Sequence, residues 1–157
     1  MKIGLIMGSI SDWGVMQEAE TVCKEFGVEV DKRIFSAHRT PAALEAWVKE
    51  ADANGISVII AGAGGAAHLA GVAAAFSILP VIGVPIKSRT LEGIDSLLSI
   101  VQMPAGIPVA TVGINGAKNA ALLAIEILSL QNPELKAKML EFREKQAAKV
   151  LATKFPE

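Results

Sequence analysis

Short runs of apolar residues alternate along the chain with longer stretches in which apolar residues recur every three or four positions. The short runs predict five strands, at 2–7, 28–35, 57–61, 81–84 and 108–112. The longer stretches predict helices at 12–26, 42–54, 69–77, 90–101, 117–130 and 133–152. Strands that alternate with helices are joined by right-handed crossovers, so the pattern predicts an α/β fold with a parallel sheet covered on both faces.

Residues at the helix ends support this assignment. Gly27 and Gly55 follow the first two predicted helices, where the tolerance of glycine for left-handed backbone ends a helix. Thr40 is expected to be the N-cap and Pro41 the first residue of the second helix. The single cysteine, Cys23, lies on the apolar face of the first helix and is expected to be a core residue, not a reactive thiol.

We expect one domain, because no repeat, charge block or low-complexity linker divides the 157 residues. It would comprise an α/β core at 1–131 and an additional C-terminal helix at 132–157. That helix carries an apolar stripe of Leu135, Met139, Phe142 and Val150. Hydrophobic residues make up 52% of the chain, and a small domain buries a limited part of its own surface. We therefore expect a homo-oligomer in which this helix packs across the domain or on a neighbouring subunit.

Charge and composition exclude several classes of protein. The net charge is -1, so the chain offers no broad positive surface for nucleic acid or for an anionic membrane. Residues 56–86 contain no charged residue apart from His68, but glycines and prolines interrupt this stretch, so it is not expected to span a membrane. The apolar run at 2–7 is too short for a secretory signal. We expect a cytoplasmic protein.

Polar residues gather where the predicted strands end. In a parallel sheet the ligand lies beyond the carboxyl ends of the strands, and the loops at those ends are 8–12, 36–41, 62–68, 85–90 and 113–118. The first three contain both histidines and most of the reactive side chains. We therefore expect these three loops to form the functional site.

The first two loops carry groups suited to a phosphorylated ligand. The hydroxyls of Ser9 and Ser11 suit a phosphate at a helix start, and Asp12 can accept hydrogen bonds from a ribose. A Ser/Asp-capped turn is the alternative explanation. In the second loop His38 can take and return a proton near neutrality, and Arg39 offers a planar fork for phosphate or carboxylate. An exposed surface pair is the alternative there.

The third loop lacks bulky side chains, so Gly64 and Gly65 allow a flat ligand to approach the backbone. A tight turn with His68 as a helix cap explains the same residues. The chain has no G-x-G-x-x-G fingerprint and no P-loop lysine. Two histidines without a cysteine or carboxylate cluster make a poor metal site, so we expect no metal and no cofactor. A serine hydrolase that uses Ser9 or Ser36 would lack the G-x-S-x-G elbow.

Taken together, the loops resemble the 5-(carboxyamino)imidazole ribonucleotide mutase family of purine biosynthesis. The matching stretches are GSISDW at 8–13, SAHRTP at 36–41, IAGAGGAAHL at 60–69, LPVIGVP at 79–85, DSLLSIVQMPAGIPVAT at 95–111 and NAALLA at 119–124. The resemblance implies a flavodoxin-like three-layer sandwich with strand order 2-1-3-4-5, and an octamer with active sites between subunits. It also implies an isomerase, free of redox steps, ATP and biotin, that moves a carboxylate from the exocyclic nitrogen of a phosphorylated imidazole nucleotide to ring carbon four.

The resemblance assigns roles to residues of all three loops. It makes His38 the proton shuttle, with Ser9 and Arg39 on the phosphate, Asp12 on the ribose and the third loop around the base and carbon dioxide. The full set of expected substrate-binding residues is Ser9, Ser11, Asp12, Ser36, Arg39, Gly64, Gly65 and His68.

Two other activities are compatible with the same fold. A sister branch of the family carboxylates aminoimidazole ribonucleotide directly with carbon dioxide, and typically has a histidine a few residues after the aspartate. Here Trp13 and Met16 follow Asp12, which favours the mutase. Ala70 and Val72 stand where a proline and a methionine are usual, which affects the expected shape of the third loop. A non-catalytic nucleotide-binding module is the second alternative, because such sheets support many functions.

Overall fold

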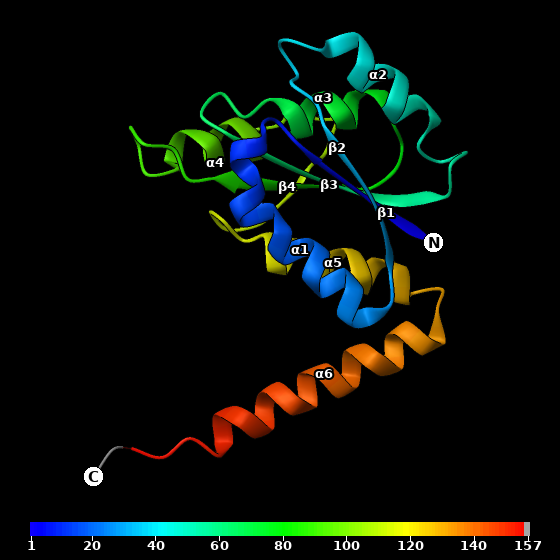
Figure 1. Cartoon of the computed structure of the whole chain (residues 1–157), viewed down its shortest axis with the longest axis vertical. Coiled ribbons are helices and arrows are strands. Elements are labelled where there is room, and N and C mark those ends of the chain that lie inside the picture. The colour runs from blue at the N-terminus through cyan, green and yellow to red at the C-terminus, as the bar shows by residue number, and fades with distance from the viewer. Residues whose placement is uncertain (156–157) are drawn as a thin grey trace.

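The computed structural model describes residues 1–155, which form one five-stranded parallel sheet with strand order β2-β1-β3-β4-β5. The strands are β1 (Lys2–Met7), β2 (Glu29–Ile34), β3 (Ile56–Gly64), β4 (Val81–Ile86) and β5 (Ala110–Thr111). Their parallel arrangement and their order confirm both the periodicity argument and the flavodoxin-like expectation (Figure 1).

Helices cover both faces of the sheet. They are the 3-10 turn η1 (Ile10–Asp12), α1 (Trp13–Phe26), α2 (Pro41–Glu50), α3 (Leu69–Phe76), α4 (Ile94–Val101), α5 (Ala117–Ser129) and α6 (Pro133–Leu151). Figure 1 shows α1 and α5 on one face and α2 and α3 on the other, with α6 outside the α1 and α5 layer. The three-layer architecture is thus confirmed, with α6 added to it.

The central strands read as continuous apolar runs because both of their faces are buried. Successive side chains of a strand point to opposite faces. In β3, Val58 and Ile60 belong to the core beneath α1 and α5, whereas Ile59 and Ala61 belong to the core beneath α2 and α3. All four side chains are fully buried. The sheet is therefore held from both sides, which fixes the strand ends that carry the polar loops.

The first turns of α1 pack tightly on the sheet next to those loops. Met16 is fully buried, and a Cβ added to Gly62 would lie 2.3 Å from its sulfur. Only a glycine in β3 permits this approach. Further along the same helix Cys23 is buried, which confirms it as a core residue.

The ends of two elements differ from the sequence prediction. Strand β3 was expected to end at Ala61 but continues to Gly64, because Ala63 and Gly64 pair with Pro85 and Ile86 of β4. Pairing with a neighbouring strand outweighs the poor strand propensity of small residues. Helix α4 was expected from Thr90 but begins at Ile94. Before it, Gly93 adopts a left-handed φ of 94° as the N-cap.

The fifth strand is shorter than the expected 108–112. Only Ala110 and Thr111 pair with β4, opposite Ile82 and Gly83. Pro108 has no N–H group to donate to a ladder, and β5 lies at an edge of the sheet with a partner on one side only. Likewise α2 ends at Glu50 and turns continue to Gly55, whose φ is +80°.

The first half of α6 packs on the domain, against α5 and the end of α1. Leu135 and Met139 are buried there, and the ring of Phe142 lies edge-on to Phe26 with centroids 5.6 Å apart. Val150, expected in the same stripe, is instead 72% exposed. The reason is length, because α6 has 19 residues and α5 only 13, so at 1.5 Å per residue α6 extends well past its partner (Figure 1). In the part of the chain described, no helix has the combination of length and apolar composition that a membrane crossing needs.

Candidate active site

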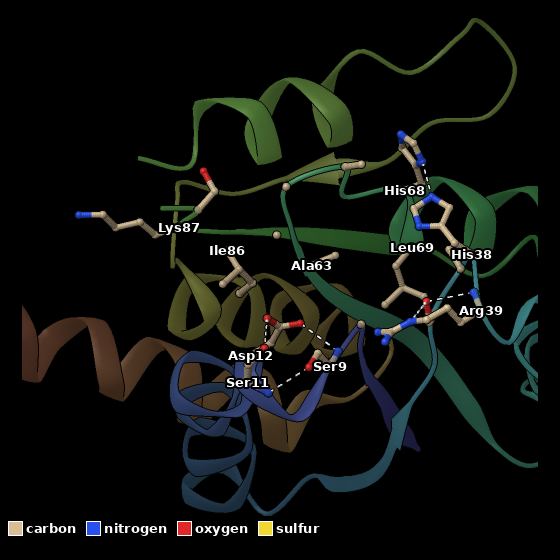
Figure 2. A pocket seen from close by; sticks show the side chains of 17 residues that line it. Ser9, Ser11, Asp12, His38, Arg39, Ala63, His68, Leu69, Ile86 and Lys87 are labelled. Carbon is tan, nitrogen blue, oxygen red and sulfur yellow. Dashed lines mark hydrogen bonds between the residues drawn. The ribbon is translucent and has the colours of Figure 1, made fainter. Parts of the chain in front are cut away.

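The carboxyl ends of β1, β2, β3 and β4 surround a cavity of about 450 Å³ (Figure 2). The nine residues that the sequence analysis expected in the site all line it: Ser9, Ser11, Asp12, Ser36, His38, Arg39, Gly64, Gly65 and His68. Parallel strands end at the same edge of a sheet, so loops far apart in the sequence meet there. Figure 2 shows the two histidines at one side of the cavity, with Ser9, Ser11 and Asp12 at the other.

The first loop forms a capping box. The hydroxyl of Ser9 accepts a hydrogen bond of 3.3 Å from the N–H of Ser11, and Asp12 Oδ2 accepts one of 3.1 Å from the N–H of Ser9. The alternative explanation of this loop, a Ser/Asp-capped turn, is therefore correct as geometry. It does not exclude a binding role, because the same three residues line the cavity.

Among residues 1–155, Asp12 is the only acidic residue that lines the cavity. It is 8% exposed, and this burial raises the pKa of the Asp12 carboxyl above its ordinary value of 3.8. Hydrogen bonds from Ser9, Ser11 and Gly8 act in the opposite direction and favour the charged form. A buried carboxylate with this support is a strong acceptor for hydroxyl groups of a ligand.

In the second loop Ser36 makes hydrogen bonds to Arg39 and Thr40, the two residues that follow His38. Thr40 stands at the N-cap position of α2, but its side chain makes no capping bond; it accepts from the N–H of Ser36 and donates to the carbonyl of Ser36. The expected positions of Thr40 as N-cap and Pro41 as first helical residue are therefore confirmed, although the threonine hydroxyl does not bond to the helix. The hydroxyl of Ser36 accepts from Nε of Arg39 at 3.2 Å, and the rest of the guanidinium points over the cavity (Figure 2).

The two histidines are hydrogen-bonded to each other. His38 Nε2 and His68 Nδ1 are 2.7 Å apart, and the rings meet edge to face at 83° with centroids 4.9 Å apart. One nitrogen must donate and the other accept, so the facing atoms hold one proton between them. His68 makes no capping bond to α3 although it occupies the N-cap position. His68 thus holds the cap position that the alternative explanation gave it, but its ring is turned to His38 and not to the helix.

Sequence reasoning placed both histidines in the site but did not predict their bond. The residues lie 30 positions apart, in loops that follow β2 and β3. These strands flank β1 in the sheet, so the predicted strand order brings the two loops to either side of the first loop. The order alone does not fix the direction of either ring.

The fourth loop adds Ile86, Lys87 and Ser88, which the sequence analysis did not assign to the site. The hydroxyl of Ser88 donates to Asp95 at 2.6 Å. The ammonium group of Lys87 pairs with Glu92 and points away from the cavity (Figure 2). A signal for this loop was its place after β4, at the same edge of the sheet.

The fifth loop is hydrogen-bonded to the fourth through Asn115. Asn115, with a left-handed φ of 58°, donates its N–H to the carbonyl of Pro85 and accepts at Oδ1 from the N–H of Lys87. Asparagine is among the few residues that tolerate this backbone conformation. Across residues 1–155, no three His, Cys, Asp or Glu side chains gather closely enough to hold a metal ion.

The fold and the cavity together define a class of protein. A flavodoxin-like sheet presents hydroxyl groups, an arginine and one buried carboxylate beside a histidine pair, a combination typical of an enzyme that holds a phosphorylated ligand and moves a proton on it. Residues 2–149 match the family described as AIR carboxylase, and the chain belongs to that family.

Relatives in this family cover nearly the whole chain. The N5-carboxyaminoimidazole ribonucleotide mutase of Pyrococcus abyssi is 63% identical over 143 residues, which are 91% of this chain and 82% of that protein. The mutase of Saccharolobus solfataricus is 57% identical over 153 residues, 98% and 97% of the two chains. The crystal structure of Treponema denticola PurE superimposes with a TM-score of 0.87 at 34% identity, covering 95% of this chain and 93% of that one. The family resemblance predicted from the sequence is confirmed.

Proposed function

We propose that the chain is a mutase of de novo purine biosynthesis, which converts 5-(carboxyamino)imidazole ribonucleotide into 5-amino-4-imidazolecarboxylate ribonucleotide. The observation that carries this proposal is a cavity of about 450 Å³ in which a histidine pair lies opposite groups suited to a ribose phosphate. The names of the two relatives, both mutases at 57% and 63% identity, support it.

The substrate is held by its phosphate and its ribose. The phosphate binds to the guanidinium of Arg39 and to hydroxyls of Ser9, Ser11 and Ser36, all of which line the cavity. The hydrogen bond between Ser36 and Arg39 Nε fixes the direction of the guanidinium before the ligand arrives, which lowers the entropy lost on binding. Asp12 accepts from the ribose hydroxyls. This anchoring directs the imidazole toward the third loop and the histidines.

The reaction then needs one residue that donates a proton to the nitrogen and later accepts one from ring carbon four. The bond between the exocyclic nitrogen and its carboxylate breaks, which releases carbon dioxide, and the nitrogen takes a proton from His38. Ring carbon four attacks the carbon dioxide, and His38 removes the proton from that carbon. The proton count closes, and no redox step occurs. His68, bonded to His38 at 2.7 Å, orients the ring of the shuttle and gives the proton a second position.

The third loop encloses the base and the carbon dioxide. Gly64 and Gly65 present backbone without side chains, so the flat ring can approach them closely. Ala63, Ala66 and Leu69 add small and apolar surface to the same wall. Carbon dioxide is uncharged and gains little from polar contacts, so retention depends on a closed wall.

Direct carboxylation of aminoimidazole ribonucleotide is the second candidate, favoured by the description of the family. The mutase and the carboxylase are distinguished by the position in α1 at which the carboxylase branch carries a histidine. Trp13 and Met16 follow Asp12 here, and Met16 is fully buried against Gly62. Neither residue can supply a titratable group to the cavity.

We further propose that the chain acts as a single domain, in a cytoplasmic homo-octamer with active sites between subunits. The exposed apolar residues on the second half of α6 support this, since Val150 is 72% and Leu151 85% exposed. This half of the helix would pack on a neighbouring subunit. Nucleic acid and membranes are not expected as partners, and activity should withstand exhaustive chelation of metals.

One assay separates the candidates. The purified protein is given either the N-carboxylated nucleotide without added bicarbonate, or aminoimidazole ribonucleotide with bicarbonate, and the carbon-carboxylated product is followed. The mutase forms product rapidly from the first substrate. Rapid product formation from the second alone would establish the carboxylase, and none from either would favour a non-catalytic binding module.

A further inference from the structure

Ser96 is a fully buried serine that does not line the cavity. It lies in the first turns of α4, and its hydroxyl makes two short hydrogen bonds. It accepts from the N–H of Gly65 at 2.8 Å and donates to the carbonyl of Ile86 at 2.7 Å. Both partners are residues of the cavity wall, so one buried hydroxyl joins two parts of that wall.

Ser96 makes these two hydrogen bonds at the point where the regular sheet ends. Gly64 pairs with Ile86 at the last position of the ladder between β3 and β4. Beyond it Gly65 turns away with a left-handed φ of 70°. The backbone groups at this point have left the ladder and need other partners, because buried N–H and carbonyl groups are almost always paired. Ser96 supplies both partners at once.

The hydrogen bond from Gly65 to Ser96 also connects α4 to the histidine pair. The carbonyl of Gly65 accepts from the N–H of Ala67 at 2.9 Å, and His68 follows directly with its ring on His38. One turn after Ser96, the hydroxyl of Ser99 donates to the carbonyl of Asp95 at 2.7 Å and lies 3.4 Å from the carbonyl of Gly65. The longer contact is weak, so Ser96 is the main link between α4 and the third loop.

We propose that Ser96 is a positioning residue that keeps the third loop closed, so that carbon dioxide stays in the cavity between the two halves of the reaction. This proposal rests on the proposed function. Without the hydroxyl, the N–H of Gly65 and the carbonyl of Ile86 lose their partner in a buried place. They recover it from water only if the loop moves outward, and that movement opens the wall next to the carbon dioxide.

Escape of carbon dioxide can be measured from the products of the reaction. The decarboxylated intermediate is then released as aminoimidazole ribonucleotide, in place of the carbon-carboxylated product. The fraction of consumed substrate that ends in this way is a property of each active molecule. A variant that only folds less well has fewer active molecules and a lower rate, but the same fraction. The groups of the first two loops that bind the substrate's phosphate are untouched, so KM should change little.

The test uses the full chain with two loss variants, Ser96→Ala and Ser96→Cys, the second of which keeps the volume with a weaker hydrogen-bonding group. Ser96→Thr retains a hydroxyl and is the rescue variant. Ser129→Ala, which removes a hydroxyl bonded to the carbonyl of Glu126 in α5, is the matched control away from the site. Each protein receives the N-carboxylated nucleotide, and both products are quantified after subtraction of the decarboxylation that occurs without enzyme.

Both loss variants should lower kcat about 10-fold to 100-fold, the scale of a small misplacement in an active site. KM should stay within about 3-fold, and the fraction released as aminoimidazole ribonucleotide should rise several-fold. Ser96→Thr should recover most of the parent fraction. The proposal is overturned if the loss variants that fold keep the parent fraction, or if Ser129→Ala changes it equally. Failure of the parent protein to form any carboxylated product would instead refute the proposed function, on which the role of Ser96 depends.

Discussion

Nε2 of His38 and Nδ1 of His68 lie 2.7 Å apart, so the loops after β2 and β3 share one proton at the end of the cavity opposite Asp12. If both rings were imidazolium, both facing nitrogens would carry a hydrogen and neither could accept a hydrogen bond from the other. Loss or gain of a proton at one ring therefore changes the hydrogen bond of the other. The pair acts as one unit with a donor end and an acceptor end, and substitutions at the two positions should not be independent.

Removal of His38 should mainly affect the chemical step. His38→Asn keeps some hydrogen bonding but cannot take up a proton, so turnover should fall about 10²-fold to 10⁴-fold, the usual contribution of a general acid/base, with binding retained. His68→Asn should cost less in turnover and more in binding. Single-turnover kinetics and ligand titration measure the two effects separately.

The double variant is the control for this assignment. Because the rings are bonded, the loss in His38→Asn/His68→Asn should be smaller than the product of the two single losses. Normal turnover in His38→Asn with an inactive His68→Asn would reverse the two roles.

Asp12 should make stability depend on pH. Burial raises the pKa of Asp12 in the folded protein, so the folded state binds its proton more tightly than the unfolded chain. This contribution is fully present below the ordinary pKa of 3.8 and is lost as pH rises through the raised pKa. Asp12→Asn does not titrate, so its Tm relative to the parent should increase from about pH 4 to about pH 7. Thermal unfolding across this range tests it, and a relative Tm that decreases would be contrary to the account.

The same substitution should weaken substrate binding, because an amide is a poorer acceptor for ribose hydroxyls than a carboxylate. Asp31, a half-buried strand residue paired with Arg33 away from the cavity, provides the matched control as Asp31→Asn. The control should bind substrate like the parent. If Asp12→Asn and Asp31→Asn lost affinity equally, the proposed contact between Asp12 and the ribose would be refuted.

The extent to which the fold follows from the sequence can be seen in β3. Its apolar run identified a strand buried on both faces, since Val58 to Ala61 alternate between two cores. Its end at Gly64 was not predictable from propensity, because Ala63 and Gly64 are strand residues only by pairing with β4. The exposure of Val150 escaped the pattern as well, since periodicity shows a face but not the length of the helix it packs against.

The site was predictable to the level of loops and not of contacts. Parallel strands bring their carboxyl ends together, so the nine expected residues lie around one cavity. The side chains between them could not be derived in the same way. The hydroxyl of Thr40, at the N-cap of α2, bonds to Ser36 and not to the helix, and Ser96 looks like an ordinary helix residue in the sequence. Such contacts depend on rotamers and on distances between elements, which no local pattern encodes.

Cys23 should be protected from thiol reagents in the folded protein. Burial, with a smaller effect of Glu20, raises the pKa of the Cys23 thiol from 9.0 to about 11, and the thiolate is the reactive form. Alkylation at about pH 8 should be slow in native buffer and fast in denaturant. The raised pKa stabilises the fold below about pH 9 and this contribution disappears as pH rises through about 11. Rapid, complete alkylation of the native protein would contradict this environment.

Assembly should depend on the exposed side of α6. Leu140 and Leu151 lie three turns apart on one face of the helix, and both are exposed, so Leu140→Lys/Leu151→Lys should leave the subunit folded. We expect the variant to form smaller species than the proposed octamer and to lose activity as it does so. Sedimentation velocity and turnover measure the two losses. Lys149→Gln, nearly opposite on the helix, should change neither, and a fully active monomer would refute active sites between subunits.

The central claim is that the carboxylate stays in the cavity while it moves between nitrogen and carbon. The most direct measurement uses the N-carboxylated nucleotide with ¹³C in its carboxylate, in a large excess of unlabelled bicarbonate. If the cavity retains carbon dioxide until ring carbon four attacks it, the carbon-carboxylated product keeps the ¹³C, and its formation rate does not depend on bicarbonate. Product that carries mainly unlabelled carboxylate, at a rate that rises with bicarbonate, would show instead that carbon dioxide is taken from solution.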